Sequence, residues 1–315
     1  MLLPLLRRTL VLVLTLVLAS WVVFAFMALL PGDPAEVALG LGATPEAVAA
    51  TRQRFGTDRP ALVQYWDWVS GLPAGDFGRS YVSDALIGPQ IGDRLQVTLW
   101  LVVTATVLSL LGAVPLGVLA AVRHRQVSGA LLSGISQVAV AVPSFLAGIL
   151  LISLFAVQLG WLPSGGWTVP AEDPVQFLRR LALPALSLAL VQGAVLTRYV
   201  RSAVLEVLRE DYLRTARAKG LTAPRALARH GLRNAAVPVV TVLGLQLATL
   251  LVGAVVVERV FVLPGLGSLL LDGTANRDLL LVQGVVMVLV VAVLLVNYLV
   301  DVLYTVLDPR LRASS

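Results

Sequence analysis

The segment "DYLRTARAKGLTAPRALARHGLRNAAVP" (Asp211–Pro238) decides how this chain is arranged, because it places dense positive charge between two long apolar runs. Twelve charged residues, nine of them basic, lie between residues 198 and 235. At about 2.5–3.5 kcal/mol for each charge at the centre of a membrane helix, inserting them all would cost on the order of 30 kcal/mol. The segment therefore stays in water or in a protein groove, while its flanks are apolar enough to cross a membrane.

The same segment carries the signals of two helices joined by a glycine corner. Lys219 precedes Gly220, and a cation followed by a glycine is typical of a helix end. Thr222 is placed to cap a second short helix, with Pro224 in its first turn. The first helix is expected to run from about residue 202 to 219, with an apolar face formed by Val204, Leu205, Leu208, Tyr212 and Thr215. The sequence predicts a helix, a corner, a short helix and a return to the membrane.

The composition is that of a polytopic membrane protein. The chain is 58% hydrophobic and 13% charged, with a mean hydropathy of +0.88, whereas soluble domains are about 45–50% apolar and 25% charged. Six runs approach the roughly 20 residues that a membrane helix needs, at 9–30, 97–122, 131–158, 181–203, 236–257 and 279–303. The first run also suits a signal peptide, but it is longer than the usual 7–15 apolar residues, so we expect a retained span.

The distribution of basic residues predicts the orientation. With the N-terminus in the cytoplasm, most of the 24 Lys and Arg residues fall on the cytoplasmic side, as the positive-inside rule requires. Both termini are then cytoplasmic. The segment 31–96 is outside, and its run "ALVQYWDWVSGL" has aromatic residues of the kind that favour a membrane interface. We expect a small folded cap there, with an ordered loop that binds no partner as the alternative.

Three functions compete for the basic loop. A helix-turn-helix that reads DNA has this shape, but membrane spans tether both its ends, so no nucleic acid is expected, despite the net charge of +6. A loop that serves topology alone needs charge but no defined corner. A docking element for a cytoplasmic partner explains both features. The absence of cysteine excludes disulfides, thiolate metal sites and a cysteine nucleophile.

The loop resembles the coupling loop of permease subunits of ABC importers. "DYLRTARAKGL" (211–221) and "RHGLRNAAVP" (229–238) look like its dipeptide, oligopeptide and nickel branch. "LLPGDPAE" (29–36), "GDFGRSY" (75–81), "VERVFVLPGLGSLLLDG" (257–273), "RDLLLVQG" (277–284) and "NYLVDVLYTVLDPRLR" (297–312) follow in the same order. The long outer loop is similar to that of the B-type permease. Arg214 stands where the general motif has an acid, as is common in this branch.

The resemblance implies an all-α, six-helix type I importer permease in the cytoplasmic (inner) membrane. Its parts would be an N-terminal helix (1–30), the cap (31–96) and a permease core (97–308) that holds the coupling loop (204–233). A second, C-type permease, two cytoplasmic ATPases and an extracytoplasmic substrate-binding protein would complete the transporter in the lipid bilayer. No cofactor is expected in this chain: ATP and Mg would bind the ATPases, since the sole lysine, Lys219, is not followed by the Ser or Thr of a phosphate-binding loop.

Cargo and site residues are expected as follows. Peptides are the first choice of cargo, with nickel chelates or glutathione as alternatives in the branch. An ion-coupled secondary transporter is a competing class, but it would need an acid in mid-span, and none lies there. An intramembrane enzyme is a second competing class, but both histidines lie in loops.

The ATPase-coupling residues are expected to be Arg209, Asp211, Tyr212, Arg214, Thr215, Ala216, Arg217, Ala218, Lys219, Gly220, Leu221 and Pro224. The translocation path takes Gln137, Ser144, Gln192, Gln246 and Thr249, with helix–helix hydrogen bonding as the alternative role for each. The outer gate takes Glu258, Pro264 and Gly265, with a loop anchor as the alternative for Glu258. An ion pair with the basic loop is expected for Asp301, which shares a helix face with Asn297, Tyr304 and Asp308. A proton site is the alternative role for Asp301.

Overall fold

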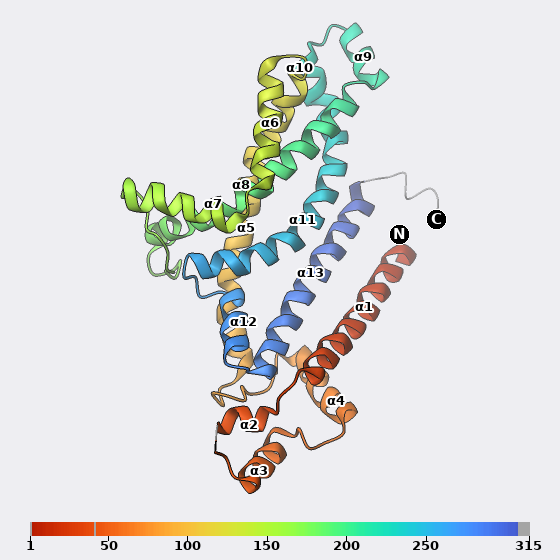
Figure 1. Cartoon of the computed structure of the whole chain (residues 1–315). Helices are drawn as coiled ribbons and strands as arrows, with labels where there is room; N and C mark the ends of the chain where they lie inside the picture. The colour runs from red at the N-terminus through yellow and green to blue at the C-terminus, as the bar shows by residue number, and fades with distance from the viewer. Residues whose placement is uncertain (1, 41, 308–315) are drawn as a thin grey trace. The chain divides into compact units, whose positions relative to one another are not determined.

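The computed structural model describes residues 2–40 and 42–307, and this part of the chain is helical without a β-strand (Figure 1). Its nearest approach to a sheet is one isolated antiparallel bridge between Arg79 and Leu86. The prediction of an all-α protein is confirmed. Asp308 and the end of the 297–312 motif lie outside the described residues.

The described residues contain five helices that are long and apolar enough to span a membrane, and a bent helix pair raises the number to six. The five are α1 (Leu2–Leu29), α5 (Ile87–Val122), α8 (Pro174–Val207), the run from α10 into α11 (Ala223–Val260) and α13 (Leu279–Leu307). They match five of the predicted spans, and several extend well beyond the apolar runs. Polar flanks continue the helices because backbone hydrogen bonding does not stop where the hydrophobic side chains do.

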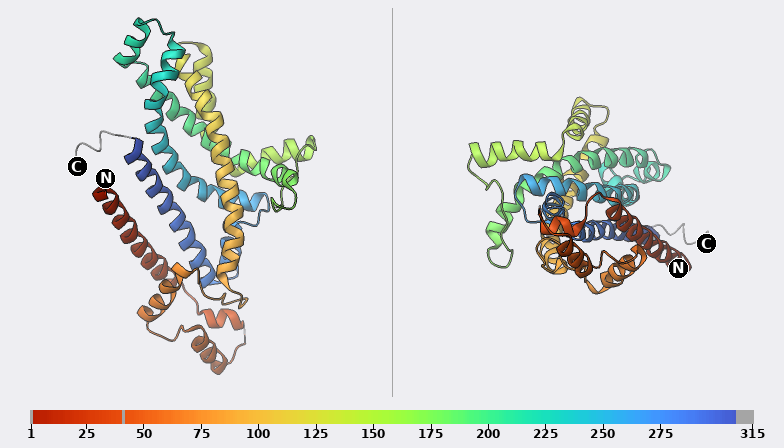
Figure 2. Two further views of the ribbon diagram at one scale, coloured as in Figure 1. Left: turned by 180° about the vertical axis from the view of Figure 1, so that it is seen from behind. Right: turned by 60° about the horizontal axis from the view of Figure 1, so that its bottom comes forward.

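The third predicted span, 131–158, is broken into two helical segments in the structure. Helix α6 (Val127–Ala141) and the run of α7 (Ser144–Leu151) with the π-helix η2 (Ile152–Gln158) meet at a bend of 100°, which is visible from three directions (Figures 1 and 2). Pro143 explains the break, because a proline forces the residue before it out of the helical region. Val142 accordingly has extended backbone angles, with φ −84° and ψ 121°.

The chain divides into two compact units, with boundaries inside α5 and α13. Within the described residues, unit 1 comprises 99–263 and 296–307, and unit 2 comprises 2–98 and 264–295. In unit 1, α8 packs against α6, α7 and α11. Close helix packing relies on glycine there: a Cβ on Gly117 would lie 2.6 Å from Val200 Cβ, so α5 approaches α8 more closely than any side chain allows.

Unit 2 holds the residues predicted as a cap, and these residues include short helices. They are α2 (Pro34–Leu39), α3 (Pro45–Phe55), α4 (Ala61–Gly71) and the 3-10 turn η1 (Leu72–Ala74), with α12 (Leu266–Ala275) in the same unit. The side chains of Asp33 and Thr44 cap α2 and α3 by accepting from backbone N–H groups. Tyr65 and Trp68 of α4 are buried with Val23 of α1 and Met287 of α13.

Candidate functional site

The basic loop (residues 204–233) begins with a break that the sequence did not suggest. Helix α8 ends at Val207, and α9 (Asp211–Ala218) starts after a turn at 208–210. The expected continuous helix over 202–219 is therefore wrong. The Arg209 and Glu210 N–H groups donate to the carbonyls of Glu206 and Val207, so the turn satisfies the backbone while it redirects the chain.

Helix α9 ends in the predicted glycine corner. Gly220 has φ +93°, in the left-handed region that favours glycine. The Leu221 N–H donates to the Ala216 carbonyl at 3.2 Å, and the Gly220 N–H donates to the Arg217 carbonyl at 3.0 Å. This pair of bonds is the Schellman motif, which satisfies the last carbonyls of a helix. Leu221 and Ala216 also pack against the same buried cluster, as the motif's hydrophobic contact requires.

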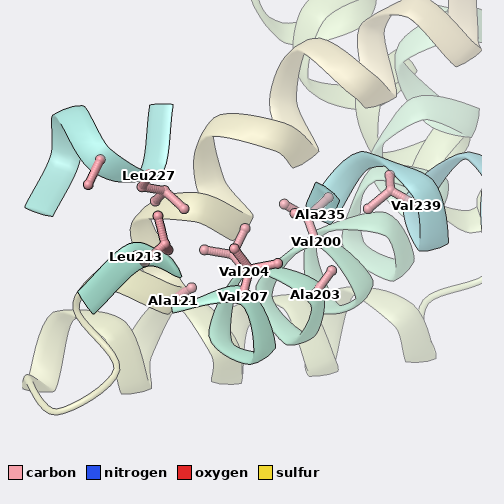
Figure 3. Packing of buried hydrophobic residues seen from close by; sticks show 10 residues of the cluster. Ala121, Val200, Ala203, Val204, Val207, Leu213, Leu227, Ala235 and Val239 are labelled. Carbon is pink, nitrogen blue, oxygen red and sulfur yellow. The ribbon is translucent and has the colours of Figure 1, made fainter. Parts of the chain in front are cut away.

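The inner face of the loop packs onto the ends of the long helices (Figure 3). Leu213 is 3% exposed and lies against Val204 and Val207 of α8. The cluster is completed by Ala226 and Leu227 from the loop and by Ala121, Val200, Ala203, Ala235 and Val239 from α5, α8 and α11. The cluster therefore joins α9 to three long helices through packed side chains.

Two residues predicted for the buried face lie elsewhere. Tyr212 and Thr215 are exposed, because the turn after Val207 shifts the helical register and Leu213 takes the inward position instead. The Tyr212 hydroxyl accepts a hydrogen bond from Asn234 Nδ2 at 2.9 Å, and the Thr215 hydroxyl donates to the Asp211 carbonyl. Tyr212 thereby ties the outer side of α9 to the start of α11.

The second helix of the loop is not a separate element. Helix α10 (Ala223–Ala226) continues through the π-helix η3 (Leu227–Gly231) into α11 (Leu232–Val260). Thr222 occupies the N-cap position as predicted, although its side chain makes no capping hydrogen bond, and Pro224 lies in the first turn. At Gly231 a Cβ would lie 2.7 Å from Leu227 Cδ1 and 3.0 Å from Val207 Cγ1, so this glycine lets α8 and η3 approach each other.

The outer face of the loop is charged and exposed. The exposed predicted coupling residues are Arg209, Asp211, Tyr212, Arg214, Thr215, Arg217, Ala218, Lys219, Gly220 and Pro224, whereas Ala216 and Leu221 are half-buried. Across the described part of this loop the one ion pair joins Arg214 to Asp211, at 3.2 Å. The structure therefore brings the predicted coupling residues onto one small element with a packed inner side and an open, basic outer side.

The residues predicted for the translocation path differ in their surroundings. Gln192 of α8 is 6% exposed, and its Nε2 has no hydrogen-bond partner among the described residues. Ser144, at the start of α7, is half-buried, with its Oγ 3.6 Å from the position of a Cβ on Gly253. Gln246 is half-buried, whereas Gln137 and Thr249 are exposed. Their assignment to a path stays a prediction.

The predicted gate residues occupy two units. Glu258 is fully buried in unit 1, and its carbonyl accepts from the Leu263 N–H at 2.8 Å. Pro264 and Gly265 lie in unit 2, where Gly265 precedes the first residue of α12. Asp301 is exposed on α13, and its pairing with the basic loop stays a prediction.

A buried carboxylate in unit 2 was not predicted from the sequence. Asp278 is 3% exposed, accepts hydrogen bonds from the Ser80 hydroxyl and, at 3.2 Å, from the Tyr81 N–H. Burial first, and then the Asp278 charge, raise the pKa of Tyr81 to about 12. An aspartate directly before the apolar run 279–303 was an available helix N-cap signal. Its partner nearly 200 residues away was not readable from the sequence.

The comparisons with known proteins agree on one family. The family model described as "Binding-protein-dependent transport system inner membrane component" matches residues 113–313, and the corresponding N-terminal model matches residues 1–102. The "Glutathione transport system permease protein GsiC" of Salmonella typhimurium (strain LT2) is 40% identical over 307 residues, which cover 98% of each chain. The protein of the same name from Escherichia coli (strain K12) is 40% identical over 306 residues, or 97% of each chain.

Two solved structures have a similar fold. An inward-facing structure of the MetNI methionine ABC transporter gives a TM-score of 0.59 at 20% identity, covering 70% of this chain and 96% of that chain. A crystal structure of an amino acid ABC transporter with histidines gives 0.51 at 17% identity, covering 69% of this chain and 94% of that chain. At these identities the similarity shows the fold alone.

Proposed function

The chain belongs to the family of binding-protein-dependent transport system inner membrane components and is the permease subunit of an ABC importer, and from this premise we propose that it carries short peptides into the cytoplasm. The support for a peptide-like cargo is the relatives named as glutathione permeases, because glutathione is itself a modified tripeptide. Glutathione itself and nickel chelates are the alternative cargoes.

The basic loop supports a coupling role through its two unlike faces. We propose that its outer face docks on a cytoplasmic ATPase subunit, whose movement on binding ATP displaces α9. The corner at Gly220 holds α9 at a fixed angle to α10, which continues into α11. Leu213 and its neighbours connect α9 to α8. A push on α9 therefore moves α8 and α11 together, and such a displacement biases the permease between two arrangements.

The full transporter in this proposal has four further subunits. They are a second permease, two ATPases that bind ATP and Mg, and an extracytoplasmic binding protein that selects the cargo. The single observation that carries the proposal is the Schellman corner on a loop with a buried inner face and an exposed, basic outer face. A loop that served topology alone would need none of this order.

Uptake with labelled cargo tests the proposal. The chain, its partner permease, the ATPases and the binding protein are reconstituted in liposomes, and uptake of a tripeptide, glutathione and a nickel chelate is measured with ATP inside. ATP-dependent uptake of the tripeptide supports a peptide cargo. Uptake of glutathione alone, or of the nickel chelate alone, would replace the peptide by that cargo. Uptake without ATP but with an ion gradient would show a secondary transporter.

A further inference from the structure

The turn between α5 and α6 carries charges that the coupling role of the basic loop does not use. It reads "RHRQ" over residues 123–126, and all four of these residues are exposed. Among the described residues, the side chains of Arg123 and Arg125 make no ion pair or hydrogen bond. The turn contains no acidic residue. It therefore presents two positive charges that nothing within the turn offsets.

The turn is held in one compact shape. The Gln126 N–H donates to the Arg123 carbonyl at 2.8 Å, and the His124 Nδ1 donates to the Ala121 carbonyl at 2.9 Å. A Cβ on Gly129, in the first turn of α6, would overlap the Arg123 carbonyl oxygen. The absence of a side chain at Gly129 thus lets the turn fold back closely onto α6. The backbone of Arg123 consequently lies directly against the start of that helix.

An apolar groove begins where this turn ends. It runs along α6 from Val127 to Ala139, has a volume of about 650 Å³ and is lined by alanine, glycine and branched aliphatic residues. Gly134 lies near its middle, where an added Cβ would meet no atom within 4 Å. At about 1.5 Å per residue the groove extends for about 18 Å, which is similar to the roughly 15 Å of hydrocarbon in one leaflet of a bilayer.

The residues on both sides of the turn set its depth in a bilayer. Val122 ends α5 and is 48% exposed, and Val127 begins α6 and is 77% exposed. Helix α5 is a candidate span, and α6 belongs to the apolar bent pair. Exposed apolar residues favour hydrocarbon, whereas charged side chains stay among headgroups or in water. The turn therefore lies at headgroup level, and the groove extends from it into the hydrocarbon.

The same end of unit 1 carries the basic loop. Ala121, two residues before Arg123, packs in one buried cluster with Leu213 of α9. The turn and the basic loop therefore face the same leaflet of the membrane. The turn differs from the loop in that it joins two apolar helices directly and opens onto an apolar groove.

We propose that the turn and the groove together bind one anionic phospholipid. Its phosphate contacts Arg123 and Arg125, because guanidinium groups bind phosphate oxygens through charge-assisted hydrogen bonds. One acyl chain lies along α6 over Gly134, where the groove is open and apolar. A soluble anion would use the arginines alone, and an apolar helix of a second permease would use the groove alone. A phospholipid uses both. The site is separate from the outer face of the basic loop and does not depend on the cargo.

Native mass spectrometry of the purified importer tests the proposal, after delipidation and readdition of phosphatidylglycerol or of zwitterionic phosphatidylethanolamine. We expect one phosphatidylglycerol to remain bound more strongly than phosphatidylethanolamine. In Arg123→Gln and in Arg125→Gln its retention should fall about fivefold, the usual weight of one basic residue at an anionic membrane surface. The matched control is Arg179→Gln, which removes an exposed arginine without an ion pair near the start of α8. It should retain the lipid.

Gly134→Leu tests the groove separately from the charges. The groove has room for the new side chain, and leucine has a higher helix propensity than glycine, so the variant should fold with its basic residues intact. Because the leucine fills the groove, phosphatidylglycerol retention should fall several-fold. Gly92→Leu is the matched control, at an exposed position of α5 where a Cβ also meets no atom within 4 Å. It should retain the lipid.

Thermal unfolding gives a second measurement. A ligand that binds only the folded state raises its stability, so added phosphatidylglycerol should raise the melting temperature of the wild type and the two controls more than that of the Arg123, Arg125 and Gly134 variants. Equal retention in all six proteins, no retained lipid, or equal retention of phosphatidylethanolamine would overturn the proposal. Loss from the arginine variants alone would also overturn it, by showing surface attraction without a groove. Dissociation of the second permease by Gly134→Leu would do so too, by showing a subunit interface.

Discussion

Two glycine corners in this chain have the same hydrogen bonds and opposite surroundings. In unit 2, the Thr57 N–H donates to the Arg52 carbonyl at 3.0 Å and the Gly56 N–H donates to Gln53 at 3.2 Å. The basic loop repeats this pattern at Gly220, and both glycines have positive φ, +72° and +93°. The same backbone device therefore ends α3 in the cap and α9 in the loop.

The surroundings of the two corners differ in what fills the adjacent space. A Cβ on Gly56 would lie 3.5 Å from the Arg59 guanidinium, which is itself paired with Asp67. A Cβ on Gly220 would meet no atom within 4 Å. The cap pairs three of its five arginines, Arg52, Arg54 and Arg59, with its own carboxylates, whereas the loop leaves most of its charges to solvent or to a partner. One corner finishes a self-contained fold, and the other presents a fixed shape outward.

The largest expected effect is that of Gly220→Val. A branched side chain at φ +93° costs about 1–3 kcal/mol, so the corner opens and α9 loses its angle to α10. We expect the variant to insert and assemble normally, while ATP-driven uptake falls about tenfold or more and ATP hydrolysis continues, because the strain lies in the element that couples the two. Uptake and hydrolysis are measured on the same proteoliposomes.

Gly56→Val is the matched control for this prediction. It introduces the same strain at the same motif, but in the cap, so hydrolysis and uptake should remain coupled. Normal uptake by Gly220→Val would refute the coupling role of the corner, and equal uncoupling by both variants would show that general strain is the cause.

The second effect is expected from Leu213→Ala. Truncating a buried leucine costs about 2–5 kcal/mol, and here it loosens the contact between α9 and Val204 and Val207. Uptake should fall several-fold, and amide hydrogen exchange in α9 should accelerate. Leu62→Ala in the cap removes the same atoms from a side chain that is 70% exposed. It should leave both measurements unchanged, and the account fails if the two variants behave alike.

A smaller effect is expected from Asp278→Asn in unit 2. The pKa of Tyr81, about 12 because of burial and the Asp278 charge, should move toward 10 while burial keeps it above that value. Because the pKa is higher in the folded state, stability from neutral Tyr81 is fully present below pH 10 and is lost as the pH rises through 12. Tyrosinate absorbance at 295 nm follows the titration. An unchanged Tyr81 midpoint in Asp278→Asn would contradict this assignment.

The smallest effect on stability is expected from Arg217→Gln in the loop. Substitution of an exposed, unpaired surface charge usually changes the unfolding free energy by less than about 0.5 kcal/mol. We nevertheless expect weaker association with the ATPase subunits and a reduced dependence of that association on salt. Co-purification of the ATPase subunits at several salt concentrations measures this association. Arg54→Gln, which breaks the ion pair with Asp84 in the cap, should leave ATPase association unchanged.

Local signals predicted the corner, and long-range packing decided the rest. Lys219 and Gly220 correctly predicted the end of α9, since helix capping depends only on residues that are neighbours in the sequence. The register predicted for α9 was wrong because the turn at 208–210 contains no glycine or proline that would signal it. That Leu213 points inward is visible only from the packing of α9 on α8. The spans followed from hydropathy, but hydropathy does not show that the span at 131–158 breaks at Pro143, since many membrane helices accommodate a proline without breaking. The bond between Ser80 and Asp278 depends on the tertiary fold and has no local signature.

The central claim is that the outer face of α9 docks on an ATPase subunit while the cap does not. The chain has no cysteine, so single cysteines introduced at exposed positions report contacts without background. Ala218→Cys in the assembled importer, treated with a short thiol-to-amine cross-linker, should yield a covalent adduct with an ATPase subunit. Asp58→Cys, at an exposed position two residues after the equivalent glycine in the cap, should yield none. An ATPase adduct from Asp58→Cys, or no ATPase adduct from Ala218→Cys, would contradict the account.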